Sequence, residues 1–245
     1  LVKGRSETEL VVNMGEEPLL WSEFSPALYK LNVELLTDEG ADNQLVDFGM
    51  KSFGVKGTQF TINGKTTFLR GKHDGCVFPL TGYPSTEVTD WLEQFRIAQR
   101  YGINHIRFHS WTPPVAAFKA ADIAGVYLQP ELPFWGTMHA KNTSLNQCLL
   151  HEGEQLLKEY GNSPSFTMMA LGNELNGDIN LMRRLVNHFR SMDNRHLYSF
   201  GSNNNLGTAG EQAGEDFFVT CRVGRDTDST YATHVRSSFS FADAW

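Results

Sequence analysis

The sequence has no apolar run as long as a membrane helix and no cluster of cationic residues. A helix that spans a bilayer needs about 20 consecutive apolar residues, and no stretch of this chain approaches that length. Lys and Arg total 21 against 28 Asp and Glu, which gives a net charge of −7, whereas a nucleic-acid surface needs clustered cations. The first residues, LVKGRSETEL, also lack the apolar core of a signal peptide. We therefore expect neither a membrane nor a nucleic acid as partner.

Cysteine is scarce as well. Cys76, Cys148 and Cys221 are odd in number, lie far apart and form no C-x-x-C pair, which excludes a disulfide framework and a zinc knuckle. We interpret all three as small buried hydrophobic residues, the usual state of a free cysteine. The chain also contains no G-x-S-x-G and no H-E-x-x-H sequence, so hydrolases built on those motifs lack support.

The first part of the chain shows the alternating pattern of β-strands. The strand candidates are TELVVNM, ALYKLNVELL, LVDFGMKSF and QFTINGKTTFLRG. Within the last of them, Asn63-Gly64 is a hairpin signal with strand residues on each side. Three or four strands are fewer than the roughly seven of a complete immunoglobulin-like sandwich. Residues 1–66 are therefore predicted to form part of an immunoglobulin-like β-sandwich domain.

From residue 67 onward, strand and helix patterns alternate. The helical segments are EVTDWLEQFRIAQRYG, PPVAAFKAADIAG, NQCLLHEGEQLLKEYG and LMRRLVNHFRSMD. The strand segments are TTFLRG, INHIRFHS, VYLQPELP, SFTMMALGNE, HLYSFGS and DFFVTC. We expect Gly102, Gly125 and Gly161 to end their helices in a left-handed conformation.

This alternation predicts an α/β fold of the (β/α)8 TIM barrel type. A doubly wound sheet is less favoured because no G-x-G-x-x-G opens the first helix. Residues 67–245 hold about six of the eight βα units. They are therefore predicted to form a partial TIM-barrel catalytic domain.

In a TIM barrel the loops at the carboxyl ends of the strands build the active site, and four successive strand ends carry polar or aromatic side chains. These candidate residues are His73 and Asp74, then Arg107, His109 and Trp111, then Glu131 and Trp135, and finally Asn173 and Glu174. On the second strand, the period of two directs Ile106 and Phe108 to the helices and leaves Arg107 and His109 on the inner side. We predict that these side chains meet in one site.

Several of these residues have a structural alternative. Arg107 either binds substrate or only holds a neighbouring carboxylate in place, and His109 is either a substrate ligand or a satisfied core histidine. Trp111 and Trp135 are either core aromatics or exposed platforms for a sugar ring. A metal site from His105 and His109 would need a third ligand that the sequence does not offer, so we predict no metal and no other cofactor.

Glu174 is the most informative of these residues. Cleavage of a glycosidic bond needs one carboxylic acid to protonate the leaving oxygen and a second carboxylate as nucleophile or base. An amide beside the acid, as Asn173 is here, can bind a sugar hydroxyl in the transition state. Carboxylates together with aromatic platforms therefore indicate a carbohydrate substrate.

These residues resemble the family-two glycoside hydrolases, the group of retaining β-galactosidases and β-glucuronidases. Asn162-x-Pro164-Ser165, an apolar strand and Gly172-Asn173-Glu174 match the acid/base signature of that family. Further matching segments are DIAGVYL at 122–128, FLRG at 68–71 and ELP at 131–133. The sequence departs from the family pattern at Met169 and Ala170, where the family commonly has Trp and Ser, and at His109, which follows Arg107 by two residues instead of three.

The resemblance implies a glycosidase that removes terminal β-linked sugars from oligo- or polysaccharides by a retaining mechanism. Glu174 would be the acid/base, and Asn173 would bind substrate beside it. The nucleophile would be a Glu near the end of a seventh strand, and Glu211 and Glu215 come too early to take that role. We therefore expect a chain truncated at both ends, with flanking parts of the same polypeptide as partners and a periplasmic or secreted location. A carbohydrate-binding barrel without catalysis is the alternative.

Overall fold

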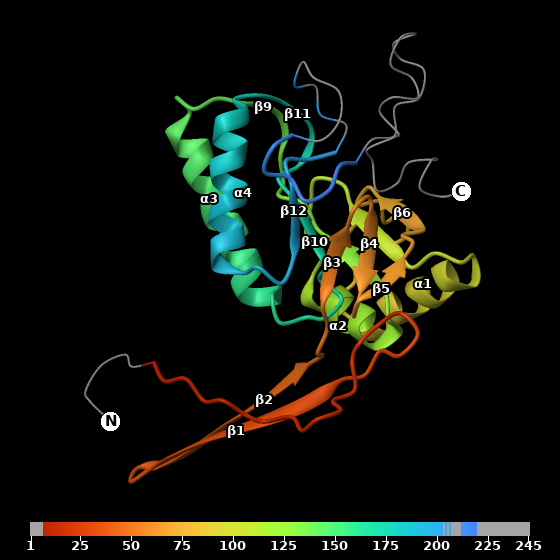
Figure 1. The fold of residues 1–245 in the computed structure, drawn as a ribbon, viewed down its shortest axis with the longest axis vertical. Helices are drawn as coiled ribbons and strands as arrows, with labels where there is room; N and C mark the ends of the chain where they lie inside the picture. The colour runs from red at the N-terminus through yellow and green to blue at the C-terminus, as the bar shows by residue number, and fades with distance from the viewer. Residues whose placement is uncertain (1–6, 203, 205, 207–211, 220–245) are drawn as a thin grey trace.

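The computed structural model describes residues 7–202, 204, 206 and 212–219, and its centre is a row of parallel strands (Figure 1). The strands of this row are β6 (Gly71–Asp74), β7 (His105–Phe108), β8 (Tyr127–Gln129), β10 (Met168–Ala170) and β12 (Leu197–Ser199). β7 pairs with β6 on one side and β8 on the other, and β10 pairs with β12. Isolated parallel bridges, such as that between Glu131 and Ala170, join the two groups. The strands therefore follow one another in chain order, without a closed barrel among the described residues.

Four helices connect these strands, at the places that the sequence pattern predicts. They are α1 (Val88–Arg100), α2 (Val115–Ala124), α3 (Thr143–Tyr160) and α4 (Ile179–Met192). Apolar residues three or four positions apart give each helix a buried face, as with Trp91, Phe95 and Ala98 on α1. Helices α3 and α4 lie side by side (Figure 1). Within the part of the chain that the structure describes, no helix is both long and apolar enough to cross a membrane.

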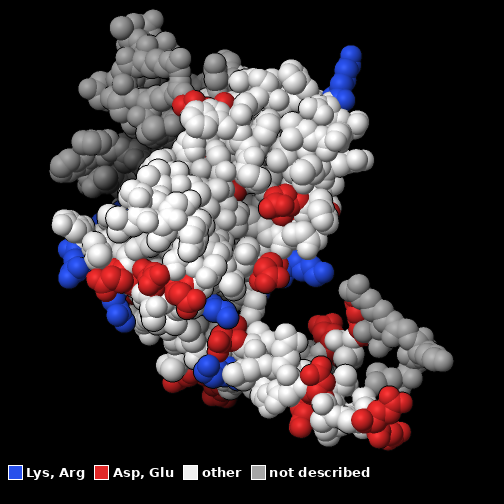
Figure 2. Space-filling view, turned by 180° about the vertical axis from the view of Figure 1, so that it is seen from behind, with Lys and Arg blue, Asp and Glu red and all other residues white. Residues whose placement is uncertain are grey.

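The amino-terminal region forms a long antiparallel hairpin of β1 (Tyr29–Thr37) and β2 (Gly40–Phe48) that extends away from the rest of the chain (Figure 1). Acidic side chains gather toward its far end (Figure 2). The exposed acidic residues around its turn are Glu34, Asp38, Glu39 and Asp42. The strand predicted at TELVVNM is wrong, because residues 8–14 run as an irregular segment without strand partners.

A second antiparallel sheet covers the amino ends of the parallel strands. It consists of β3 (Phe53–Lys56), β4 (Gln59–Ile62) and β5 (Lys65–Thr67). The predicted Asn63-Gly64 hairpin is confirmed, with both residues at positive φ, 51° and 77°. Phe53 and Phe60 are buried in one cluster with Tyr127 of β8 and Met168 of β10. This sheet therefore packs against the parallel strands and shares no strand pairing with β1 and β2.

The first strand of the parallel row begins later than predicted. TTFLRG was expected to form it, but the Asn63-Gly64 turn brings Thr66 and Thr67 back to pair with β4. The parallel strand β6 begins only at Gly71. His73 and Asp74 therefore lie within this strand. For the predicted strand DFFVTC, the described residues contribute one parallel bridge, between Val219 and Ser202, and residues 220–221 lie outside the described part.

Two further predictions about single residues are wrong. Cys76 and Cys148 are exposed, because Cys76 follows β6 in a loop and Cys148 occupies the outer face of α3, whereas Cys221 lies outside the described residues. Gly161 ends α3 in a right-handed conformation, with φ −58°. A Cβ at Gly161 would come within 2.9 Å of the Asp193 carboxylate, so a close approach, and not a left-handed turn, accounts for this glycine.

Asn162 and Ser165, in the amino-terminal half of the acid/base signature, make contacts that join the segments around α2. The Asp122 carboxylate accepts a hydrogen bond from the Ser165 N–H at 2.9 Å, and its backbone carbonyl accepts one from the Trp21 indole at 2.8 Å. The Asn162 amide donates to the carbonyl of Asp47 at the end of β2. Burial raises the pKa of Asp122 to about 6. These contacts lie at the end of the strands opposite to the candidate site residues.

A pair of glycine variants tests whether α2 is fixed against the amino-terminal segment. Gly125 and Gly102 have nearly equal φ, 75° and 77°, but a Cβ at Gly125 would lie 2.9 Å from the Glu23 carbonyl, whereas one at Gly102 would meet nothing within 4 Å. Left-handed backbone costs an alanine about 1–2 kcal/mol, so Gly102→Ala should lose this amount. Gly125→Ala should lose clearly more, as measured by urea unfolding. Equal losses would contradict a tight contact at Glu23.

Candidate active site

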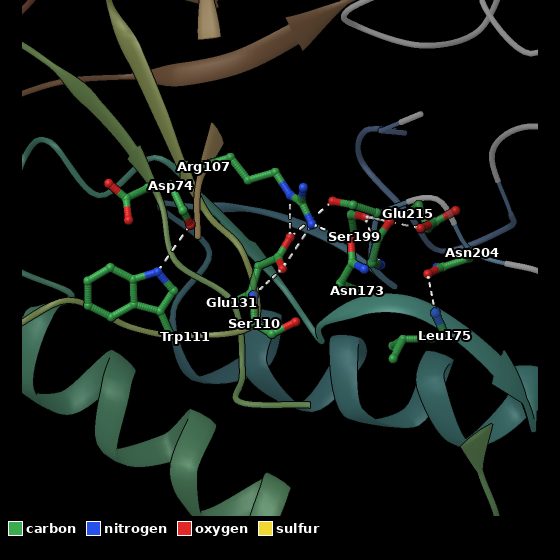
Figure 3. Close-up of polar contacts among 12 residues, drawn as sticks. Asp74, Arg107, Ser110, Trp111, Glu131, Asn173, Leu175, Ser199, Asn204 and Glu215 are labelled. Atoms are coloured by element: carbon green, nitrogen blue, oxygen red, sulfur yellow. Dashed lines mark hydrogen bonds and ion pairs between the residues drawn. The ribbon is translucent and has the colours of Figure 1, made fainter. Parts of the chain in front are cut away.

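A buried ion pair connects the carboxyl ends of β7 and β8. The Arg107 Nε donates to one oxygen of Glu131 at 2.7 Å, and an Nη donates to the other at 3.1 Å, as Figure 3 shows. The Glu131 side chain is fully buried and that of Arg107 is 11% exposed. Two parallel hydrogen bonds of this kind fix both groups in orientation as well as in position.

Two further donors from neighbouring strand ends complete the surroundings of Glu131. The backbone N–H of Ser110 donates to it at 2.8 Å, and the Ser202 hydroxyl donates at 3.0 Å. Burial raises the pKa of Glu131, and the charge of Arg107 opposes this rise. A carboxylate that receives several hydrogen bonds and one bidentate guanidinium is stabilised in its ionised form.

Arg107 also fixes the orientation of Asn173. The same Nη donates to the Asn173 Oδ1 at 2.7 Å, and Asn173 is only 2% exposed. Because a guanidinium has donors and no acceptor, the amide oxygen and not the amide nitrogen must face it. The Asn173 Nδ2 therefore points away from Arg107 and can donate elsewhere.

Glu174 lies at an irregularity of the sheet. Beyond the parallel row, β9 (Trp135–Met138) pairs with β11 (Asn173–Gly177), with Asn173 opposite Trp135 and Asn176 opposite Thr137. Three steps along β11 thus match two along β9, which is a β-bulge, and bulges redirect side chains. Glu174 has φ 51° here, and its carboxylate accepts a hydrogen bond from the Trp135 indole at 3.2 Å.

The glycine before this pair has a steric reason. Gly172 has φ 145°, and a Cβ there would collide with the backbone carbonyl of Phe134. That carbonyl accepts the hydrogen bond of the Asn173 N–H at 3.1 Å. The glycine thus permits the close approach that pairs the start of β11 with the segment leading into β9.

Non-glycine residues in left-handed conformation concentrate at the strand ends. Cys76, Ser110 and Glu174 have φ between 51° and 58° and follow β6, β7 and β10, respectively. Such residues cost about 1–3 kcal/mol each and are typical of active sites. Elsewhere in the described ranges, Asn63 in its hairpin turn is the remaining example.

A row of rings leads from β6 to Glu174. The ring centroids of His73 and His109 are 5.0 Å apart, and those of His109 and Trp135 are 4.9 Å apart. Burial, followed by the charge of Arg107, lowers the pKa of both histidines. Both imidazoles are therefore neutral at neutral pH and can donate or accept a hydrogen bond.

Asp74 and Trp111 lie on the other side of β6 and β7. The Asp74 carboxylate accepts hydrogen bonds from Lys72 at 2.9 Å and from the Cys76 N–H at 3.1 Å. The Trp111 indole donates to the Asp74 carbonyl, and its ring packs against Phe108. Trp111 thus makes the contacts of a core aromatic, whereas the side chain of Trp135 is 60% exposed.

The structure places most of the sequence-predicted residues in two connected sets that meet at the neighbouring residues Asn173 and Glu174. Hydrogen bonds join Arg107 to Glu131 and Asn173, while ring contacts and the indole hydrogen bond join His73, His109, Trp135 and Glu174. Arg107 makes the contact with a neighbouring carboxylate that was its structural alternative. His105 is buried, and burial lowers its pKa to about 3. Among the residues described, no cluster of three or more His, Cys, Asp or Glu could hold a metal ion.

The sequence analysis missed Ser110, Ser202 and Asn204. Ser202 donates to Glu131 through its hydroxyl, and its carbonyl accepts from the Glu174 N–H at 2.7 Å. The Asn204 side chain accepts from the Leu175 N–H at 3.0 Å (Figure 3). For Ser202 and Asn204 the available signal was position, because the polar run SNNN begins at the last residue of the predicted strand HLYSFGS.

The acidic residues before Val219 have structural partners. Glu215 accepts hydrogen bonds from the Phe200 N–H at 2.7 Å and from the Ser199 hydroxyl at 3.2 Å. Asp216 accepts from Arg190 and from the Tyr198 N–H. Glu211 lies outside the described residues.

Comparison with known proteins finds relatives among glycosidases. The chain is 26% identical over 214 residues to the β-galactosidase BgaC of Bifidobacterium adolescentis, a match that covers 79% of this chain and 20% of that protein. Its fold resembles a β-D-glucuronidase from Dictyoglomus thermophilum, with a TM-score of 0.72, 19% identity and coverage of 93% of this chain and 43% of that one.

A glycosyl hydrolase family 2 member from Bacteroides cellulosilyticus gives a TM-score of 0.70 at 20% identity, covering 90% of this chain and 31% of that one. No family model matches the sequence. The chain is similar to glycoside hydrolases of family two, and it spans about a fifth of the length of its Bifidobacterium relative.

The buried ion pair should matter far more for stability than an exposed one. Glu131→Gln leaves the Arg107 charge buried without its counter-ion, so the free energy of unfolding should fall by about 3–5 kcal/mol. The matched control is Asp47→Asn, which breaks the exposed Lys30–Asp47 pair at 3.1 Å and should cost less than about 1 kcal/mol. Urea unfolding of both variants measures the difference. A loss at Glu131 as small as that at Asp47 would contradict the structural role of the pair.

The two histidines should titrate below the ordinary histidine pKa. For His73 and His109, burial and Arg107 lower the pKa, against the opposing charges of Asp74, Glu131 and Glu174. Nuclear magnetic resonance of the imidazole C–H signals should give both midpoints below about 6.5. Because each folded pKa is depressed, the histidines contribute stability that is present above the unfolded value and is lost as the pH falls through the folded one. A midpoint above the ordinary value would mean that the carboxylates outweigh Arg107.

Proposed function

We propose that this chain carries the acid/base side of a retaining β-glycosidase active site that removes terminal β-linked sugars from oligo- or polysaccharides. The observation that carries the proposal is the pair Asn173–Glu174. One residue is oriented by a buried guanidinium, and the next is turned by a bulge at the carboxyl end of a parallel strand. Active sites of parallel α/β folds lie at this end of the strands.

We further propose that the five strands of the parallel row, followed by the predicted strand DFFVTC, are the first six strands of a (β/α)8 barrel in residues 67–245. Chain-order pairing of five parallel strands, each pair connected by a helix, supports this topology. Residues 1–66 then hold part of an immunoglobulin-like sandwich, to which the projecting β1–β2 hairpin belongs. In this assignment β3, β4 and most of β5 precede the barrel in sequence but close its amino end in space.

The proposed chemistry uses Glu174 twice. As an acid, it donates its proton to the glycosidic oxygen while the bond between that oxygen and the sugar carbon breaks. As a carboxylate, it then takes a proton from the water that releases the sugar. A retaining mechanism also needs a nucleophilic carboxylate about 5–5.5 Å from the acid, and we assign no described residue to that role.

Asn173 and the histidines would hold the sugar. With its oxygen bound to Arg107, Asn173 can offer its Nδ2 protons to a sugar hydroxyl, a contact that strengthens in the transition state. Neutral His73 and His109 can exchange hydrogen bonds with further hydroxyl groups. Arg107 and Glu131 act through Asn173 and are positioning residues.

A carbohydrate-binding barrel without catalysis is the weaker interpretation. Its support was the unassigned second carboxylate, but the relatives that match the chain over most of its length carry enzyme names. A binding module also has no need for a carboxylate placed on strained backbone at a bulge.

Substitution of Glu174 tests the assignment through the leaving group. In the full-length gene product, Glu174→Gln should reduce kcat/KM for an unactivated phenyl or alkyl β-glycoside by about 10²–10⁴-fold, the usual contribution of general acid catalysis. The loss for a 2,4-dinitrophenyl glycoside should be far smaller, because that leaving group needs little protonation.

The control is Glu154→Gln, which alters an ion pair with His188 on the α3–α4 surface and should affect neither substrate. Equal losses of kcat/KM on both glycosides in Glu174→Gln would show that Glu174 is not the acid.

A further inference from the structure

We propose that Asn204 is a positioning residue for the proposed acid, because its side chain holds the chain at Glu174 in the left-handed conformation that brings the carboxylate to the Trp135 indole. This inference rests on the proposed function, since it takes Glu174 as the acid. Asn204 follows β12 and has no contact with a sugar in this assignment. It acts on Glu174 through the backbone of the next residue, Leu175.

The direction of the Leu175 N–H is the first observation. In an extended strand, successive N–H groups point to opposite edges of the strand. Here the N–H of Glu174 donates to the Ser202 carbonyl at 2.7 Å, and the next N–H, that of Leu175, donates to the Asn204 Oδ1 at 3.0 Å (Figure 3). Both donors therefore point toward the segment after β12. The left-handed conformation of Glu174, with φ 51°, supplies the turn that this requires.

The Asn204 hydrogen bond is therefore specific for one conformation of Glu174. The Ser202 bond fixes the chain just before this turn. With Glu174 extended, the Leu175 N–H would point to the opposite edge of β11, and the Asn204 oxygen could not accept from it. A bond that forms in one of two conformations shifts the equilibrium toward that conformation. The bond thus offsets part of the cost of a left-handed residue that is not glycine.

The packing around the Asn204 amide is the second observation. A Cβ at Gly201 would lie 2.7 Å from the Asn204 Oδ1 and 2.7 Å from the carbonyl oxygen of Gly172. The N–H of Ser202 donates to the same Gly172 carbonyl at 3.1 Å. Because Gly201 has no side chain, the amide packs directly against this backbone and keeps its oxygen next to the Leu175 N–H.

Loss of the Asn204 bond should leave Glu174 in two conformations. In the left-handed one, the Trp135 indole donates to the Glu174 carboxylate at 3.2 Å. In the extended one, the side chain would turn away from this indole. A general acid contributes only when it is correctly placed, so only the left-handed fraction of the molecules would protonate the leaving oxygen.

Substitution of Asn204 tests this role through the leaving group. In the full-length gene product, Asn204→Ala should lower kcat/KM for a phenyl β-glycoside by about three- to tenfold, the effect of one hydrogen bond on the equilibrium. The loss for a 2,4-dinitrophenyl glycoside should be less than about twofold, because that leaving group needs little protonation. In the Glu174→Gln background, Asn204→Ala should cause no further loss, because the two residues act through one carboxyl group.

Asn187→Ala is the matched control for these assays. The exposed Asn187 side chain on α4 accepts a hydrogen bond from Arg190. Its loss removes one amide contact of the same kind away from the strand ends and should affect neither glycoside.

The indole N–H signal of Trp135 in the ¹⁵N-labelled 245-residue chain reports the position of Glu174 without turnover. The signal is assigned by its disappearance in Trp135→Phe, and Glu174→Ala gives its position without the carboxylate contact. Asn204→Ala should move the signal toward that position. Asn204→Asp, which keeps an acceptor for the Leu175 N–H, should leave the signal near its original place, and Asn187→Ala should not change it.

Three results would overturn the proposal: an unmoved Trp135 signal in Asn204→Ala, a signal in Asn204→Asp displaced as far as in Asn204→Ala, or equal losses of kcat/KM on the two glycosides. The last result would indicate a merely structural residue. If Glu174→Gln itself shows no dependence on the leaving group, the proposed acid is wrong. A moved Trp135 signal would in that case still establish that Asn204 sets the conformation of Glu174.

Discussion

The geometry of the site depends on the buried ion pair of Arg107 and Glu131. Removing two charges from water costs several kcal/mol per ion, and their attraction compensates only when hydrogen bonds satisfy the remaining donors and acceptors. Glu131 meets this condition with Arg107, Ser110 and Ser202 as donors. These partners come from the ends of β7 and β12, and Glu131 itself follows β8. The hydrogen bonds that offset the cost of burying the ion pair therefore also hold these strand ends together.

The positions of Asn173 and Glu174 depend on this ion pair. Because Arg107 can only donate, it decides which end of the Asn173 amide faces the open side. The next residue is then displaced by the bulge into left-handed backbone, where its carboxylate meets the Trp135 indole. The backbone strain at Glu174 persists because Ser202 and Asn204 hold the N–H groups of Glu174 and Leu175. Strain of this kind is maintained only where surrounding contacts over-determine the conformation.

The periodicity of the sequence predicted the four helices and four of the five parallel strands, because both depend on local spacing of apolar residues. It failed where tertiary contacts decide. The Asn63-Gly64 turn takes Thr66 and Thr67 into β5 and delays the parallel strand to Gly71. Cys148 was expected to be buried because free cysteines usually are, but it faces solvent from α3. The strand ends could be found from the sequence, whereas the partners of Glu131 could not, since Ser202 reaches it across 71 positions of chain.

The residues of the acid/base signature lie at the two ends of one buried strand region. Asn162 and Ser165 bind Asp47 and Asp122 at the amino end, while Asn173 and Glu174 lie at the carboxyl end. Between them Phe166 to Leu171 are fully buried, and a strand advances about 3.3 Å per residue. The strand must span the distance between the contacts of Ser165 at its amino end and the polar site at its carboxyl end. This distance therefore sets the number of residues between Ser165 and Asn173. A change of one residue in this interval would also turn the inward-facing side chains outward, so the spacing carries more structural information than the residues Gly172-Asn173-Glu174 alone.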